Sequence, residues 1–234
     1  NITSLQGIKS FGFLQYLRCD GNNLTVLDLS GMNHLSTLHC EYLAGSPDNT
    51  IYPLQHINVN DCVMLNQLIY NHGNLITVSA NNCTNMSKLA CVGNQITSLS
   101  IVGATALTEL SVAFNNLTAI DLSSATSLVV LFCRNNQLTQ IDLHDNLLLE
   151  SFQCESNLLT ELDVTMLSNL FMFKCDGNQL TSLDLSNHPS LTYFSCVSNQ
   201  LTELNIDNST FFDFDISDNE LSSINEYSLR NVGE

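Results

Sequence analysis

The sequence predicts a right-handed solenoid made of short stacked coils, and three observations lead to this fold class. Cysteine recurs every 21 residues, at Cys133, Cys154, Cys175 and Cys196. Apolar and polar residues alternate around each of these cysteines, and an asparagine follows three positions later. A unit of this length cannot bury its own apolar face, so neighbouring units must stack to make a core.

The first half of each unit predicts a short β-strand. The pattern reads L-x-x-L-x-C-x-x-N-x-L-T-x-L-D-L-S, which is typical of a leucine-rich repeat. Leu131 and Cys133 should point to one side of a strand, and Phe132 and Arg134 to the other. Stacked units therefore predict a curved solenoid with a concave parallel β-sheet of about ten short strands. Their centres are expected near Arg18, His39, Ile69, Ala90, Ser111, Phe132, Gln153, Lys174, Ser195 and Asp215.

The second half of each unit predicts a different structure. Its L-T-x-L-D-L-S segment is too short and too rich in β-branched and polar residues for a multi-turn helix. We expect extended or 3₁₀ segments on the convex side and little or no α-helix. The recurrent asparagine falls where the strand must turn, and its amide can pair with main-chain groups there. This predicts an asparagine ladder made of Asn22, Asn94, Asn115, Asn136, Asn157, Asn178, Asn199 and Asn219.

The repeat is interrupted at a few places. Cys40 and Tyr70 lie 30 residues apart rather than 21, and we place the extra residues in a loop near 42–53. One residue is missing between Cys196 and Ile216. Insertions in repeat arrays map to loops, so neither change should disturb the stack.

The repeats account for residues 1–234, which predicts a single leucine-rich-repeat domain. The first residues already match the middle of a repeat, so we expect a chain truncated at its N-terminus. Residues 224–234 are expected to form a partial C-terminal cap.

Composition excludes some partners. The chain has 6 Lys+Arg against 23 Asp+Glu and a formal charge of −17, which opposes binding to nucleic acid. No segment approaches the ~20 apolar residues of a transmembrane helix. We expect a monomer without a transmembrane segment.

The nine cysteines are interpreted as core residues. Seven occupy an inward position that Tyr70, Val112 and Ile216 fill in other repeats, and buried thiols behave as small apolar groups. No C-x-x-C pair supports a metal site. Cys62 and Cys83 lie on the convex half of successive coils, where a disulfide is one alternative, although parallel side chains do not suit its torsion angle. We expect buried free thiols there too.

The outward strand positions are free of core packing and are the predicted binding surface. Apolar residues gather in its middle, at Ala113, Phe114, Val129, Val130 and Phe132. An alternative is that Phe114 and Val129 fold over the sheet edge and are half-buried. The predicted partner-binding residues are Tyr16, His39, Glu41, Phe114, Val130, Phe132, Arg134, Met172, Lys174 and Tyr193.

No catalytic residue, cofactor or metal is expected. His39, Glu41 and His72 lie on adjacent strands, but exposed histidines are more often incidental than metal ligands. Asp213, Asp215 and Asp218 lack the spacing of a calcium loop, so a solvated acidic surface is the preferred interpretation. The sequence has no G-x-S-x-G, P-loop or H-E-x-x-H motif. We therefore expect a protein that is not an enzyme.

The repeats resemble the bacterial internalin-type leucine-rich-repeat proteins with a cysteine ladder, through the four L-x-x-[LF]-x-C-x-x-N blocks and the opening Ile2–Ile8. This resemblance implies a secreted or cell-surface bacterial protein that binds a protein or glycan on its concave face. One alternative is a structural spacer that projects another domain from the cell surface. Hydrolysis of a surface polymer is a third, more remote alternative.

Overall fold

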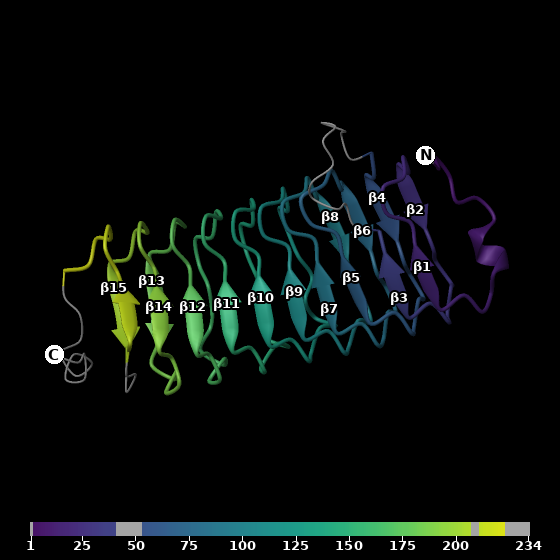
Figure 1. The fold of residues 1–234 in the computed structure, drawn as a ribbon. Coiled ribbons are helices and arrows are strands. Elements are labelled where there is room, and N and C mark those ends of the chain that lie inside the picture. Colours follow the sequence, from purple (N-terminus) through teal and green to yellow (C-terminus); the bar gives the residue numbers. More distant parts are fainter. Residues whose placement is uncertain (1, 41–52, 207–210, 223–234) are drawn as a thin grey trace.

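The computed structural model describes residues 2–40, 53–206 and 211–222, which form an elongated stack of coils (Figure 1). On one side, each coil contributes a short strand, and these strands pair in parallel within two sheets. The only helix of the described residues is the 3₁₀ turn η1 (Ile8–Ser10), so the expected solenoid is confirmed. The ten strands of this side are β1 (Tyr16–Arg18), β3 (Thr37–His39), β5 (Gln67–Ile69), β7 (Lys88–Ala90), β9 (Glu109–Ser111), β10 (Val130–Phe132), β11 (Ser151–Gln153), β12 (Met172–Lys174), β14 (Tyr193–Ser195) and β16 (Asp213–Asp215).

The strands pair in the register that the repeat predicts. Of these ten strands, the eight from β5 onward form one sheet, while β1 and β3 pair with each other in a separate sheet. Leu131 pairs with Leu110 on one side and with Phe152 on the other, so equivalent positions of successive coils lie side by side. The core therefore consists of columns of like residues that run along the stack.

The middle residue of each strand forms the largest of these columns. Leucines fill it in the N-terminal coils, and phenylalanines replace them from β11 onward. The rings of Phe152 and Phe173 stack at 5.4 Å with an angle of 7°, and Phe194 continues the column 5.7 Å from Phe173. Aromatic stacking thus extends the apolar core toward the C-terminal coils.

The predicted cysteine ladder forms the next column, and all nine cysteines are buried free thiols. Burial raises the pKa of Cys91 and of Cys196 to about 12, because water that would stabilise a thiolate is excluded. On the other side of the stack, Cys62 Sγ donates to the main-chain oxygen of Leu29 at 3.1 Å, and Cys83 Sγ donates to that of Val59 at 3.1 Å. Buried thiols, rather than the alternative disulfide, are therefore confirmed at both positions.

The asparagine ladder is confirmed as well. Asn136 Nδ2 donates to the main-chain oxygens of Val112 and Cys133, both at 3.0 Å. Its Oδ1 accepts the N–H of Leu117 in the preceding coil at 2.9 Å. The residue before each ladder asparagine has a left-handed backbone, as in Phe114 with φ 56°. Each asparagine therefore closes its own turn and ties it to the coil before it.

The opposite side carries strands that the sequence did not predict. There β2 (Val26–Asp28), β4 (His56–Asn58), β6 (Thr77–Ser79) and β8 (Ser98–Ser100) form a four-stranded sheet, and β13 (Ser182–Leu185) pairs with β15 (Glu203–Ile206). Extended segments were expected, but their lateral pairing was not.

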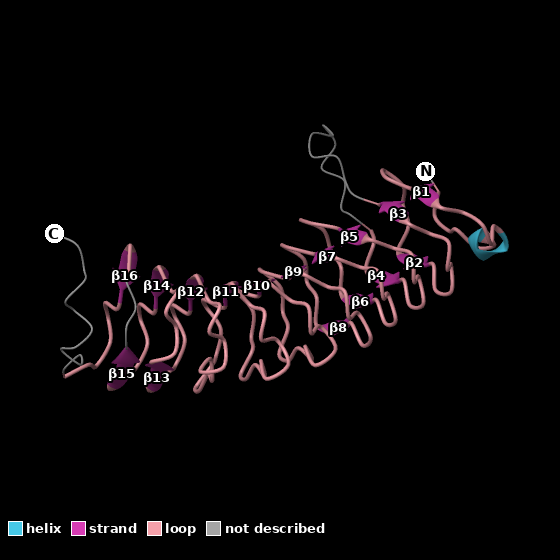
Figure 2. Ribbon diagram, turned by 90° about the horizontal axis from the view of Figure 1, so that it is seen from below, coloured by secondary structure: helices cyan, strands magenta, loops and turns pink. Residues whose placement is uncertain are grey.

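Between β8 and β13 the segments 119–122, 140–143 and 161–164 belong to no strand. The stack bends so that the ten strands lie on its inner, concave side (Figure 2). The three unpaired segments thus lie on the outer side of the bend, between the two paired parts of the convex side.

Two sequence predictions fall mostly on residues that the structure does not describe. The insertion loop near 42–53 lies outside the described residues, apart from Pro53. The partial cap at 224–234 lies outside them entirely. Both therefore stay predictions.

Candidate partner-binding face

The outward side chains of the ten strands form one surface, which we call the concave face. The first and third residues of each strand point outward, and the middle residue points into the core. Val130 lies beside Glu109 on one side and Ser151 on the other, because the strands pair in register. The scaffold thus fixes where each outward side chain sits relative to its neighbours.

The predicted binding residues do not form one cluster. Glu41 lies outside the described residues. The other nine form an N-terminal group of Tyr16 and His39, a central group of Phe114, Val130, Phe132 and Arg134, and a C-terminal group of Met172, Lys174 and Tyr193.

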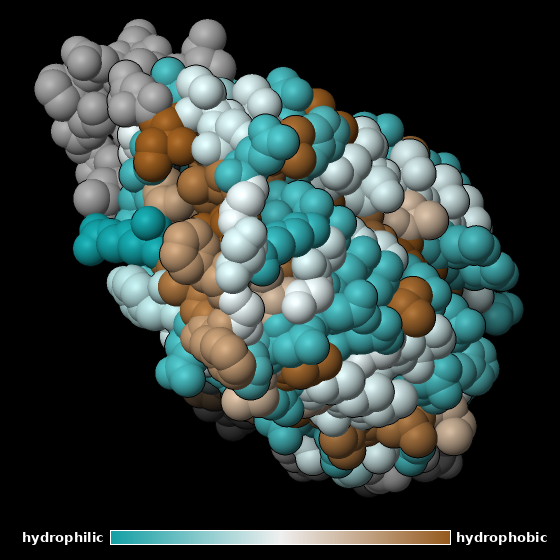
Figure 3. Space-filling model, turned by 90° about the vertical axis from the view of Figure 1, so that its right-hand side faces the viewer, coloured by the Kyte–Doolittle hydropathy of each residue, from teal (hydrophilic) through white to brown (hydrophobic). Residues whose placement is uncertain are grey.

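The N-terminal group is aromatic. The rings of Tyr16 and His39 lie 5.4 Å apart on neighbouring strands, and both side chains are exposed. Phe13 contacts His34 at 5.1 Å nearby. Seen from this end of the stack, hydrophobic residues occur as separate groups among hydrophilic ones (Figure 3).

The central group combines a cation with an aromatic ring. The Arg134 guanidinium lies 5.0 Å from the ring centre of Phe114, within the range of a cation–π contact. Val130 and Phe132 are half-buried, while Phe114 remains 46% exposed. Of the two residues that the alternative interpretation placed over the sheet edge, Val129 is half-buried and Phe114 is exposed.

The prediction that Ala113 adds to an exposed apolar surface is wrong. Its side chain is 3% exposed. Its counterparts in the adjacent coils, Val92 and Arg134, are longer, and a methyl group between longer side chains is screened from solvent. Ala90 and Ser111 are also buried, in the same row of third strand residues as Phe132.

The C-terminal group contains an aromatic residue that the sequence analysis missed. Phe171 and Tyr193 pack edge to face at 5.2 Å, and Phe212 extends the row with its ring 5.6 Å from Tyr193. Phe212 is 81% exposed. It directly precedes its strand, as Phe171 does, and so lies outside the outward strand positions from which the sequence analysis chose the binding surface.

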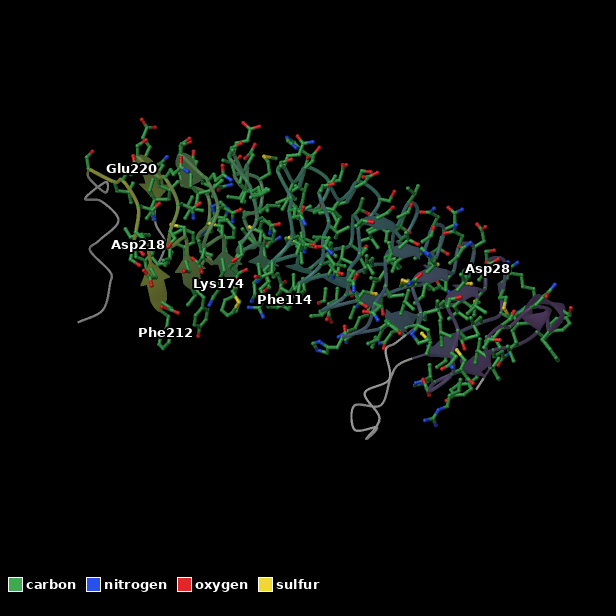
Figure 4. The ribbon with its side chains drawn as sticks, turned by 90° about the horizontal axis from the view of Figure 1, so that it is seen from above. Asp28, Phe114, Lys174, Phe212, Asp218 and Glu220 are labelled. Carbon is green, nitrogen blue, oxygen red and sulfur yellow. The ribbon has the colours of Figure 1, made fainter. Side chains whose placement is uncertain are left out.

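Positive charge gathers on the concave face. Of the five cations that the structure describes, Lys9 alone lies elsewhere, paired with Asp28. Arg18 pairs with Asp20 at 2.6 Å and Lys88 with Glu109 at 2.7 Å, which neutralises the N-terminal coils. Lys174 and Phe114 project from the same side of the stack as Phe212 (Figure 4).

The carboxylates of the C-terminal coils have two different environments. Burial raises the pKa of the half-buried Glu155 above its ordinary value. The side chain and main-chain N–H of Ser217 both donate to Asp215 and lower its pKa. Asp215 is therefore an exposed, permanently charged group at neutral pH.

The convex side carries an open groove of about 760 Å³. It lies where the lateral strand pairing is broken, and Asp142, Asp163 and Asp184 line it. Asp142 accepts a hydrogen bond from His144 at 2.7 Å, which raises the pKa of this exposed histidine. In the described ranges no group of three His, Cys, Asp or Glu side chains converges to a metal-binding arrangement. The groove is thus open to solvent and offers no chelating geometry.

Comparisons with known proteins agree with this geometry. The sequence matches no protein-family model and no curated protein at a significant level. Among solved structures, the chain is similar to the functional domain of InlJ from Listeria monocytogenes, which includes a cysteine ladder. Identity is 25% and the TM-score 0.54, over 95% of this chain and 53% of that one. The chain thus spans about half the length of that relative.

Two further structures share the fold. The internalin InlF of Listeria monocytogenes is 19% identical with a TM-score of 0.52, over 86% of this chain and 79% of that one. YopM from Yersinia enterocolitica is 17% identical with a TM-score of 0.53, over 92% and 61% respectively. Within the described part of the chain, no helix is long and apolar enough to cross a membrane.

Stacked parallel coils, an asparagine ladder and inward leucines define this chain as a leucine-rich-repeat solenoid. Its column of buried cysteines is similar to the cysteine ladder of InlJ, and its fold is similar to the folds of InlJ and InlF.

Proposed function

We propose that this chain is a non-catalytic recognition module of a secreted or cell-surface bacterial protein, and that it binds a protein or glycan on its concave face. The observation that carries the proposal is the set of exposed aromatic residues that flank the strands of the concave face. Phe114, Phe171 and Phe212 are each at least 44% exposed and have no place in the core. Exposed aromatic groups on a rigid scaffold are typical of interaction surfaces.

Further support comes from the scaffold itself. The internalin-type resemblance favours a bacterial surface or secreted protein, and the solved structures it resembles come from bacteria. Parallel strands hold the outward side chains in fixed rows, which lowers the entropy cost of binding.

The test compares partner binding by the wild type with binding by Phe132→Glu. Biotinylated protein is presented to a glycan array and to extracts of candidate host and bacterial cells. Binding should be lost in Phe132→Glu and kept in Gln140→Glu, which places the same charge at an exposed position on the opposite side of the stack. Equal binding by both variants would refute a role for the concave face.

A structural spacer is the second candidate, favoured by the continuous elongated stack (Figure 1). In that case simultaneous substitution of Phe132, Val130 and Tyr193 would leave every interaction of the protein unchanged. Loss of an interaction in this triple variant would exclude the spacer as the sole function.

A further inference from the structure

We propose that the C-terminal coils of the concave face bind a positively charged, lysine- or arginine-bearing peptide segment of the partner. This rests on the proposed recognition role and adds the chemistry of the partner. The surface concerned, which we call the aromatic–acidic corner, is formed by Phe171, Tyr193, Phe212, Asp213 and Asp215.

The aromatic part of the corner is a continuous row across three coils. Tyr193 packs against Phe171 at an angle of 78° and against Phe212 at 60°. The three rings are therefore tilted against one another, so ring edges and ring faces both reach the surface. Phe212 is 81% exposed, so burial of its ring contributes little to the free energy of folding. A ring face exposed in this way can accept a cation from a partner.

The acidic part of the corner lies beside the rings. Asp213 directly follows Phe212 and pairs in register with Tyr193, so a carboxylate and two rings are neighbours. Asp215 is exposed in the same strand, and Ser217 holds its carboxylate in place through two hydrogen bonds. A lysine or arginine above the rings would meet these carboxylates at the same time.

The charge balance of this corner differs from that of the rest of the face. Lys174 is the one cation among the described residues of the last four coils. In the N-terminal coils, Arg18 and Lys88 each pair with a carboxylate of the same surface. Unpaired negative charge is therefore concentrated at the C-terminal end of the concave face.

A cationic segment suits these observations better than the other occupants. An anionic partner would be repelled by the corner and by a chain of net charge −17. A neutral glycan could stack on Tyr193 and donate hydrogen bonds to Asp213 and Asp215, but it would leave their negative charge uncompensated. A basic peptide is also steered toward the corner by the field of the whole molecule.

The probe is an eight-residue peptide of alternating arginine and glycine that carries a zwitterionic rhodamine dye. Its binding to the whole chain is followed by fluorescence anisotropy at an ionic strength of about 0.1 M, where the Debye length is about 10 Å. The control peptide replaces each arginine by citrulline, which keeps the shape and removes the charge. We expect the arginine peptide to bind and the citrulline peptide to bind at least about tenfold more weakly, because exposed charge pairs supply the affinity.

Matched variants separate the corner from the general negative charge. Phe212→Ala and Asp213→Asn should each raise Kd by about three- to fivefold, the size of one exposed cation–π or ion-pair contact. Phe13→Ala removes an equally exposed ring at the other end of the stack, and Glu203→Gln removes a charge from the convex side of the same region. Both controls should leave Kd within about twofold, since neither touches the corner.

Three results would overturn the inference: no binding of the arginine peptide, equal binding of the citrulline peptide, or equal weakening by Glu203→Gln and Asp213→Asn. Its failure is distinguishable from failure of the proposed function. If Phe132→Glu abolishes binding of a partner while the arginine peptide does not bind, recognition by the concave face stands and the basic nature of the partner is refuted.

Discussion

Asn136 offers the sharpest test of how the coils are held together. Its side chain is 8% exposed and forms four hydrogen bonds. Nδ2 donates to the main-chain oxygens of Val112 and Cys133 at 3.0 Å and of Arg134 at 3.3 Å, and Oδ1 accepts the Leu117 N–H at 2.9 Å. Asn136→Ala removes all four without disturbing the apolar columns.

The four lost bonds are not equivalent. The oxygen of Val112 still accepts from Asn115 at 3.0 Å, and that of Cys133 still accepts from Asn157 at 3.1 Å. The N–H of Leu117 has no second acceptor among the described residues. A buried N–H left without an acceptor lowers the free energy of unfolding by about 1–3 kcal/mol. Each lost hydrogen bond whose acceptor keeps another donor lowers it by about 0.5–1.5 kcal/mol. We therefore expect Asn136→Ala to lower the free energy of unfolding by about 3 kcal/mol.

The measurement is urea unfolding followed by far-ultraviolet circular dichroism, with amide hydrogen exchange at Leu117 as the local readout. Asn219→Ala is the matched control: it makes the same pattern of bonds, but it is half-buried in the last described coil and should cost less. In the double variant Asn115→Ala/Asn136→Ala, Val112 loses both side-chain donors, so the loss should exceed the sum of the single losses by about 1 kcal/mol. A loss below about 1 kcal/mol for Asn136→Ala, or strict additivity, would refute this account.

Three other outcomes are expected. Burial raises the pKa of Cys91 and Cys196 from 9.0 to about 12, so these thiols ionise more readily in the unfolded chain. The free energy of unfolding, measured by urea titration, should therefore fall as pH rises from 9 toward 12. A free energy that stays constant over this range would contradict the burial of the thiols. In a thermal unfolding assay, Gly103→Ala should lower the free energy of unfolding by about 1–2 kcal/mol, because its φ is +78° and an added Cβ would lie 2.7 Å from Asn82 Oδ1. Gly12→Ala is the control and should lower it less, because the space around Gly12 is open. Phe173→Ala should cost about 3–5 kcal/mol because the ring is fully buried between two others, and calorimetry showing under about 1 kcal/mol would exclude that packing.

The concave half of each coil could be predicted because each of its side chains has a single structural role, either in the core, at the surface or in the turn. Leu131 and Cys133 alternate with Phe132 and Arg134, and a strand with one buried side requires that alternation. Asn136 was recognisable from its fixed spacing alone, since a turn at that place needs a side chain that both donates and accepts. A repeated physical requirement thus leaves a repeated sequence pattern.

The convex side was less predictable because pairing there depends on how the stack bends. The segments Ser98–Ser100 and 140–143 occupy equivalent places in their coils, yet the first pairs as β8 and the second belongs to no strand. Lateral pairing of such segments depends on the curvature of the stack. This curvature is summed over many coils, so the sequence of a single repeat does not predict it. Phe212 was missed for a simpler reason: it precedes its strand and does not occupy one of the outward strand positions.

The buried thiols bear on the compartment in which the protein works. Free cysteines oxidise readily outside the cell, and a surface protein with nine of them would normally form disulfides. The thiolate is the reactive species, and burial raises the pKa of Cys196 from 9.0 to about 12. Each thiol is also enclosed by its neighbours in the stack, so an oxidant can reach it only when coils separate. A column of reduced cysteines is therefore compatible with a secreted solenoid for as long as the coils stay stacked. In oxidising buffer, these thiols should stay reduced only while the hydrogen bonds that Asn136→Ala would remove hold the coils together.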